Sequence, residues 1–266
     1  MNAIAGKSRY IARQADANGI IHYSEAEHAR WQSLMQAQME VLPDYAAPFY
    51  LEALEHLGLP QDHIPQCHEV SRCLLETSGW CVVPVPALID FSTFFSMLAR
   101  RQFPAASFIR SQQEMDYLQE PDIFHEILGH APLLTEPDYA DFVQAYGMAG
   151  CRASPQEQVW LARLFWFTIE FGLIQTDLGI RAFGAGIVSS RSELTYALED
   201  PVVEHRGFDE IDILRTPYRI DILQPVYYVL ENIEQLFQLT HKDLNSLVRK
   251  ARALGLEPAR FDRQSA

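Results

Sequence analysis

Residues 121–132 read Pro-Asp-Ile-Phe-His-Glu-Ile-Leu-Gly-His-Ala-Pro, and this stretch decides how the rest of the chain is interpreted. Within it lie two histidines, His125 and His130, and two carboxylates, Asp122 and Glu126. The residues between them are mainly aliphatic or aromatic, so a helix formed here would lie against a hydrophobic core. Ionisable groups in a buried element need partners, and the stretch therefore predicts polar chemistry inside the fold.

The residue types indicate a metal site. Imidazole and carboxylate together suit a borderline divalent metal such as iron or zinc, but two histidines alone leave the site incomplete. The predicted third ligand is Glu170, the only ionisable side chain from Leu164 to Ile174. An ionised carboxylate in an apolar helix is costly unless it is paired or bound to a metal. Two histidines and one carboxylate form the facial arrangement of non-haem Fe(II) oxygenases, and this is the site predicted for His125, His130 and Glu170.

The spacing of the histidines raises a geometric difficulty. They are five residues apart, which separates them by about 140° on a regular α-helix. One histidine is therefore expected at a helix end, where Gly129 lets the backbone turn. The zinc protease signature H-E-x-x-H is one residue shorter than the H-E-x-x-x-H found here. A zinc hydrolase with Glu126 as its general base is thus a disfavoured alternative.

Three motifs, in the same order along the chain, resemble the pterin-dependent aromatic amino acid hydroxylases, and among them the short bacterial members. They are residues 117–134 around the histidines, residues 165–173 around the glutamate, and residues 183–190, which read Phe-Gly-Ala-Gly-Ile-Val-Ser-Ser. The similarity runs from about Tyr23 to about Leu239. Three separated matches over nearly the whole chain make coincidence an unsatisfactory explanation.

The resemblance implies a mainly α-helical fold with a few short β-strands, with a single catalytic domain at residues 23–266 and an N-terminal arm at residues 1–22. It implies hydroxylation of L-phenylalanine to L-tyrosine by O2, with Fe(II) and a tetrahydropterin, either tetrahydrobiopterin or a bacterial analogue. Hydroxylation of tryptophan or tyrosine by the same mechanism stays open, because pocket shape selects the amino acid. A non-enzymatic protein that keeps the scaffold is a further alternative. A monomer or homodimer is expected.

The resemblance also implies residues for the substrate. Arg110, eleven residues before Pro121, is expected to pair with the substrate carboxylate, a bidentate task that suits a planar guanidinium. Asp122 is expected to orient this arginine, with a helix-start cap as the alternative. Trp166 is assigned to the substrate pocket, with a place in the core as the less favoured alternative. The rest of the implied pocket lies in the third motif, at Gly186 and Ser189, and Ser189 is expected to contact either the substrate or a metal ligand.

The segment at residues 84–94 resembles the pterin loop of the family. Backbone near Ala87 and Ile89 is expected to hydrogen-bond the pterin, and Phe94 to stack on its ring, because an aromatic face holds a flat heterocycle well. In the family, the glutamate matching Glu126 lies beside the pterin and the open iron face, so it is assigned both a cofactor-binding and a catalytic role. By spacing alone, Phe94 is as much a core residue, and Glu126 fits a solvated helix carboxylate.

Two positions depart from the family pattern. Many members have tyrosine where this chain has Phe165, and the animal enzymes have threonine where it has Leu118. Neither position is therefore assigned a catalytic role.

The composition favours small-molecule chemistry. The 266 residues carry a net charge of −14, which disfavours binding to nucleic acid or anionic membranes. The four cysteines, at positions 67, 73, 81 and 151, show no C-x-x-C spacing and are expected to be reduced thiols. No segment approaches the roughly 20 apolar residues that span a bilayer. A cytoplasmic protein is the expectation.

Local patterns predict the order of elements. A capping box at Ser24 opens the first helix. Further helices are expected at about 44–57, 65–79, 91–101, 137–149, 154–179, 226–239 and 243–254, with a short one after Ser190. Extended segments are expected at 80–85, 105–109 and 220–223.

Overall fold

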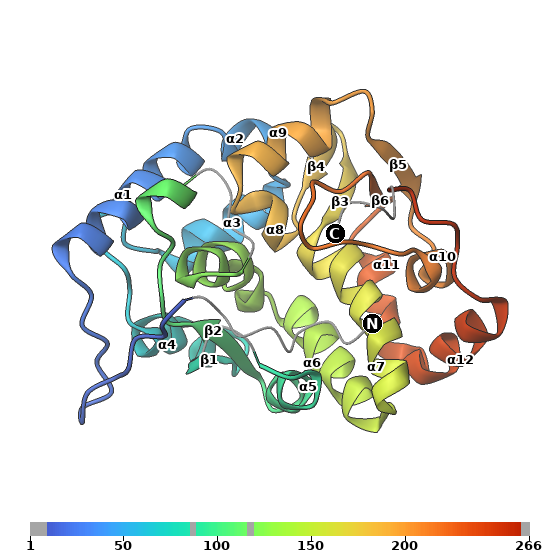
Figure 1. Ribbon diagram of the computed structural model, residues 1–266, viewed down its shortest axis with the longest axis horizontal. Helices are drawn as coiled ribbons and strands as arrows, with labels where there is room; N and C mark the ends of the chain where they lie inside the picture. Colours follow the sequence, from blue (N-terminus) through green and yellow to red (C-terminus); the bar gives the residue numbers. More distant parts are fainter. Residues whose placement is uncertain (1–9, 86–88, 116–119, 262–266) are drawn as a thin grey trace.

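The computed structural model describes residues 10–85, 89–115 and 120–261, and most of these are helical (Figure 1). The first half of the chain contains α1 (Glu25–Met39), α2 (Leu42–Tyr45), α3 (Pro48–Leu57), α4 (Cys67–Thr77), β1 (Cys81–Val85), α5 (Phe91–Ala99), β2 (Gln102–Ala106) and a 3-10 turn (Gln112–Glu114). Ser24 caps α1 through a capping box, as its sequence predicts.

The second half begins with the π-helix η2 (His125–His130). It is followed by the 3-10 turn η3 (Pro132–Thr135), α6 (Pro137–Arg152), α7 (Pro155–Phe165), the π-helix η4 (Trp166–Glu170), β3 (Gly172–Thr176), β4 (Gly179–Ala182), α8 (Ala185–Val188), α9 (Arg191–Glu199), β5 (Glu204–Gly207), α10 (Glu210–Arg215), β6 (Val226–Leu230), α11 (Glu234–Phe237), a 3-10 turn (Gln238–His241) and α12 (Leu244–Leu254). The prediction of a mainly α fold with a few short strands is confirmed.

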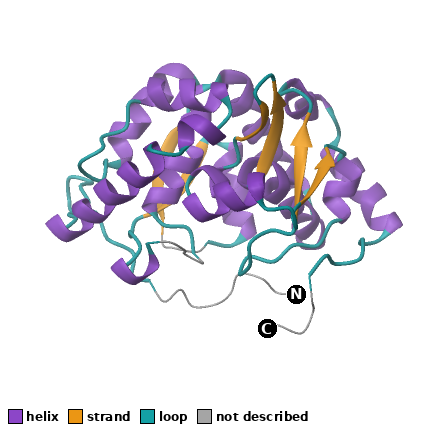
Figure 2. Cartoon of the chain, turned by 90° about the horizontal axis from the view of Figure 1, so that it is seen from above, coloured by secondary structure: helices purple, strands orange, loops and turns teal. Residues whose placement is uncertain are grey.

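The strands form two small sheets that lie among the helices (Figure 2). Strands β1 and β2 pair in parallel, and the second sheet has the order β4-β3-β6-β5. In this second sheet β3 is antiparallel to β4 and parallel to β6, which is also parallel to β5. Because β3 begins two residues after Glu170, the sheet anchors the end of the segment that carries this carboxylate.

Three sequence predictions in the second half of the chain were wrong. Residues 226–239 were expected to be one helix, but Val226–Leu230 is the strand β6 and only Glu234–Phe237 within that range is α-helical. The helix expected to continue to about residue 179 ends at Glu170, and residues 220–223 form no strand. A short apolar run that is buried on both faces does not distinguish a buried strand from a helix by periodicity, and pairing between β3 and β6 decides the outcome.

The histidine stretch lies in the hydrophobic core. The apolar side chains of Ile123, Phe124, Ile127 and Leu128 are all buried, and the Tyr50 hydroxyl donates to the carbonyl oxygen of Leu128 at 2.7 Å. The core therefore fixes the backbone of the segment that carries both imidazoles. Within the described chain, no helix is both long enough and apolar enough to cross a membrane.

Candidate metal centre and substrate pocket

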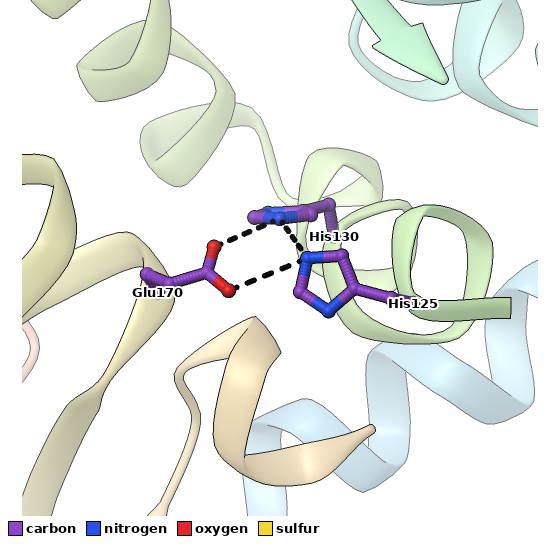
Figure 3. Close-up of side chains that lie close together, drawn as sticks. All are labelled: His125, His130 and Glu170. Carbon is purple, nitrogen blue, oxygen red and sulfur yellow. Dashed lines mark hydrogen bonds and ion pairs between the residues drawn. The ribbon is translucent and has the colours of Figure 1, made fainter. Parts of the chain in front are cut away.

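The side chains of His125, His130 and Glu170 face one another (Figure 3). His125 Nε2 lies 3.3 Å from Glu170 Oε1, and His130 Nε2 lies 3.2 Å from Glu170 Oε2. The two Nε2 atoms are 3.2 Å apart. Each residue offers one ligand atom, and these atoms lie within 4.8 Å of one another. The three residues that sequence analysis selected thus converge as a facial metal site requires.

A π-helix removes the geometric difficulty of the five-residue spacing. Its hydrogen bonds join residues five apart, so His125 and His130 lie on the same side of η2. As expected, one histidine sits at a helix end, because His130 is the last residue of η2, but the backbone does not turn at Gly129. Gly129 lies inside η2, where an added Cβ would come within 2.8 Å of the Ala185 carbonyl oxygen. This glycine lets η2 approach α8 closely, and the wider helical turn aligns the imidazoles.

The carboxylate ligand is also carried by a π-helix. Glu170 is the last residue of η4, which continues α7 without a break. An added Cβ at Gly186 would lie 2.8 Å from Glu170 Oε1 and 2.8 Å from Phe171 Cζ. The glycine in the third motif therefore leaves room for the carboxylate oxygen, and it also lines the pocket as the sequence suggested.

The protonation states suit a divalent cation. Burial lowers the pKa of His125 to about 4, so its imidazole is neutral at neutral pH. The Ser189 hydroxyl donates to the Ala185 carbonyl oxygen at 2.7 Å, so its oxygen accepts from His125 Nδ1 at 2.9 Å. This places the ring proton on Nδ1 and leaves the Nε2 lone pair for a metal.

The third ligand is charged. Burial alone would raise the pKa of Glu170, but the imidazoles of His125 and His130 hold it below its usual value. The donor set is therefore two imidazole nitrogens and one carboxylate, which fits a mononuclear divalent ion.

Arg110 and Asp122 form a buried ion pair beside this centre. Arg110 Nε and Nη2 donate to the two oxygens of Asp122 at 2.8 and 2.9 Å. The backbone amides of Arg110 and His125 donate to the same carboxylate at 2.9 and 3.1 Å. Although Asp122 is 0% exposed, the Arg110 guanidinium holds the pKa of its carboxyl below the usual range against the effect of burial. Asp122 thus both orients the arginine and caps the start of the histidine segment.

A cavity of about 540 Å³ opens over the three ligand side chains. It is mainly lined by apolar and aromatic residues, a common composition for a small-molecule site. Of the predicted site residues, it exposes Arg110, Glu126, Ile89, Phe94, Trp166, Gly186 and Ser189. Asp122 lies behind Arg110, and Ala87 and Leu118 lie outside the described residues.

Phe94, Trp166 and Glu126, for each of which the sequence left two interpretations open, all line the cavity. Phe94 packs edge-on against Phe165, with ring centroids 5.3 Å apart, and both rings reach the cavity. Trp166 lines the cavity and is not a fully buried core residue. Glu126 is not a solvated helix carboxylate, because it is 8% exposed. Burial, with the charges of Glu170 and Asp122, raises its pKa well above the usual value.

Sequence reasoning missed part of the cavity wall, which comes from residues distant in the chain. These are Glu193, Tyr218, Ile220, Ile222 and Gln224. Glu193 stands three residues after Ser190, whose hydroxyl oxygen accepts from its amide, so in the sequence it resembles an ordinary first-turn acid. The only available signal was the buried character of the strand that follows Gln224, and that strand was misassigned.

A pocket of this size over two imidazoles and one carboxylate defines the class of mononuclear non-haem metal enzymes. Comparison with known proteins narrows this class. The family model of the biopterin-dependent aromatic amino acid hydroxylases matches residues 5–254, and the chain belongs to this family.

Similar proteins cover nearly the whole chain. The phenylalanine-4-hydroxylase of Pseudomonas aeruginosa is 52% identical over 259 residues, which are 97% of this chain and 98% of that protein. The apo structure of the cold-active phenylalanine hydroxylase from Colwellia psychrerythraea matches with a TM-score of 0.92 and 48% identity over 95% of this chain and 98% of that one. The phenylalanine hydroxylase of Chromobacterium violaceum, solved with bound oxidised Fe(III), matches with a TM-score of 0.86 and 39% identity over 95% of each chain.

Proposed function

We propose that this protein hydroxylates L-phenylalanine to L-tyrosine, using O2 and a tetrahydropterin at one Fe(II) ion held by His125, His130 and Glu170. The observation that carries the proposal is the convergence of these three side chains at the base of a cavity that also exposes a buried arginine. Iron and the reduced pterin supply the activation of O2 when they are bound, and the protein supplies position and a dry pocket.

Arg110 binds the carboxylate of the amino acid. Asp122 accepts from Nε and from one N–H of Nη2, and Nη1 donates to the Met115 carbonyl oxygen at 3.5 Å, so one N–H each of Nη1 and Nη2 remains for the substrate. The arginine is 5% exposed, and a charge-assisted hydrogen bond is stronger in such a site than in open water. Because the Asp122 carboxylate also holds the His125 amide, the substrate anchor and one metal ligand share a rigid support.

The aromatic side chains of the cavity hold the two ring systems. Trp166 lies near the carboxylate ligand and lines the side assigned to the amino acid. Phe94 and Ile89 line the side assigned to the pterin. Burial raises the pKa of the Glu126 carboxyl, and this group lines the cavity, where it is assigned a polar contact with the pterin. Expulsion of water from the aromatic pocket strengthens these polar contacts.

A cytoplasmic location is proposed for the protein. The four cysteines are free, and Cys67 is buried, which agrees with a reducing compartment.

An anaerobic reconstitution experiment tests the function. The metal-free protein is loaded with Fe(II) or Zn(II) and supplied with O2, a synthetic tetrahydropterin and phenylalanine, tyrosine or tryptophan. Tyrosine formation from phenylalanine with iron alone is the expected result. Hydroxylation of only tryptophan or tyrosine would change the substrate assignment, and hydrolytic activity with zinc and no iron-dependent product would overturn the proposal.

A further inference from the structure

Gln224 joins several walls of the pocket through its side chain. It is 2% exposed, and its carboxamide makes three hydrogen bonds. Oε1 accepts from the indole Nε1 of Trp166 at 3.0 Å. Nε2 donates to the carbonyl oxygens of Arg219 at 2.9 Å and Ile222 at 2.7 Å. Both donors of the amide and its acceptor are engaged, so the group has one orientation that satisfies all its partners.

The first wall is a loop between α10 and β6. Residues 218–223 lie outside helices and strands, and the cavity is lined by Tyr218, Ile220 and Ile222 from this loop. The two hydrogen bonds from Gln224 hold the backbone of the loop at Arg219 and Ile222, on either side of Ile220. The shape of this wall therefore depends on a side chain just beyond the loop.

The second wall is the indole of Trp166. Its ring lies against Tyr218, with centroids 4.4 Å apart and planes at 19°, and against Phe171 at 4.6 Å. Stacking alone leaves a ring free to slide in its plane, because offset geometries differ little in energy. The hydrogen bond to Gln224 removes that freedom. Trp166 stands four residues before Glu170 on the same π-helix, so its position is defined relative to the metal centre.

Gln224 is itself anchored from α9. Its backbone amide donates to Glu193 Oε1 at 3.3 Å, and the hydroxyl of Tyr227 donates to the same oxygen. Glu193 is buried, so this support is shielded from solvent. The hydrogen bonds run from α9 through Gln224 to Trp166 without an exposed member among the side chains that form them.

We propose that Gln224 is a positioning residue that fixes the Trp166 indole and the loop at residues 218–223. Through these two walls it sets how closely the pocket holds the ring of the amino acid. This inference rests on the proposed function. Displacements near 1 Å can cost two orders of magnitude in a positioned reaction. A loosened wall should therefore weaken amino acid binding and lower the amount of tyrosine formed per tetrahydropterin oxidised.

The test variant is Gln224→Met, which keeps the length of the side chain and removes all three hydrogen bonds. Anaerobic calorimetry on the iron-loaded protein without pterin should show the Kd for L-phenylalanine rising about 10-fold, as expected for the loss of roughly 1.4 kcal/mol. The tyrosine-to-pterin ratio should fall, while the KM for the pterin stays within about two-fold of wild type.

Gln158→Met is the matched control. Gln158 is buried on α7 and donates to the Gly150 carbonyl oxygen at 3.0 Å, and it does not line the cavity. This variant should lose stability but keep the wild-type Kd and tyrosine-to-pterin ratio. If Gln224→Met behaves like this control, or like wild type, the positioning role is wrong.

Trp166→Phe tests the same hydrogen bond from the other side and remains informative if Gln224→Met fails to fold. It should lower the tyrosine-to-pterin ratio, and adding Gln224→Met to it should cost less than Gln224→Met costs in wild type. Equal costs in both backgrounds would overturn the link through Trp166. Failure of the proposed function would appear separately, as wild-type protein that forms no tyrosine, and calorimetry would still report on amino acid binding.

Discussion

Replacing Glu193 with glutamine should raise the free energy of unfolding, compared with wild type, by more at pH 8 than at pH 4.5. Burial raises the pKa of Glu193 from 4.5 to about 7, although the hydrogen bonds from the Tyr227 hydroxyl and the Gln224 amide act in the opposite direction. Below pH 4.5 the carboxyl is protonated in both the folded and the unfolded chain. Between pH 4.5 and 7 only the unfolded chain loses the proton, so folding stability falls as the pH rises.

The size of the effect follows from the shift. The pKa of Glu193 is about 2.5 higher in the folded than in the unfolded chain, which corresponds to roughly 3 kcal/mol at 1.36 kcal/mol for each pKa unit. This loss of folding stability is complete above pH 7. Glutamine keeps an acceptor oxygen for Tyr227 and Gln224 and cannot ionise. The difference in the free energy of unfolding between Glu193→Gln and wild type should therefore move in favour of the variant by up to about 3 kcal/mol over this range.

Urea unfolding of the metal-free proteins at pH 4.5, 6, 7 and 8 measures this difference, and contributions from other titrating groups cancel in the comparison. Tyr227→Phe is the companion variant. It removes a hydrogen bond that favours the ionised carboxylate, so its stability should decline more steeply with pH than that of wild type. A Glu193→Gln difference that stays flat within about 0.5 kcal/mol from pH 4.5 to 8 would refute the reasoning.

Three further variants test the metal centre and the substrate anchor. Glu170→Gln should lower Fe(II) affinity about 10- to 100-fold or more and abolish tyrosine formation, and retained iron in equilibrium dialysis would show that the carboxylate is not a ligand. Gly186→Ala should displace the Glu170 carboxylate, since the added Cβ would lie 2.8 Å from Oε1, and a weakened metal affinity with little change in far-UV circular dichroism is expected. Arg110→Ala should raise the KM for phenylalanine and also lower the free energy of unfolding by about 3–5 kcal/mol, because Asp122 would remain buried without its partner. An unchanged KM for this last variant would contradict the assignment of Arg110 to the substrate carboxylate.

The grouping of His125, His130 and Glu170 was predictable because burying an uncompensated charge is costly. A lone carboxylate at Glu170, in an otherwise apolar run, requires a partner wherever the segment lies in the fold. The helical register that aligns His125 with His130 was not predictable from spacing, because the choice between an α- and a π-helix depends on contacts such as that of Gly129 with Ala185. The proposed boundary between an arm and a catalytic domain at residues 22 and 23 stays a prediction.

The far wall of the pocket was beyond sequence reasoning for a different reason. Gln224 and Glu193 act through partners 58 and 34 residues away, at Trp166 and Tyr227. A glutamine before a proline carries no local sign of such contacts. The strand β6 compounded the error, since its Val-Tyr-Tyr-Val-Leu run forms the centre of a sheet only because β3 and β5 lie on either side of it.

The π-helix η2 also relates this centre to the shorter zinc protease motif. A π-turn is an α-turn that has gained one residue, so His125 and His130 occupy equivalent places one wide turn apart, as histidines four apart do on a regular helix. Removing a single residue between them would recreate the shorter spacing, but it would also shift every downstream contact of the segment by one position. A difference of one residue thus decides whether paired imidazoles share one face of an α-helix or of a π-helix. In this protein the surrounding core packs against the π-helix.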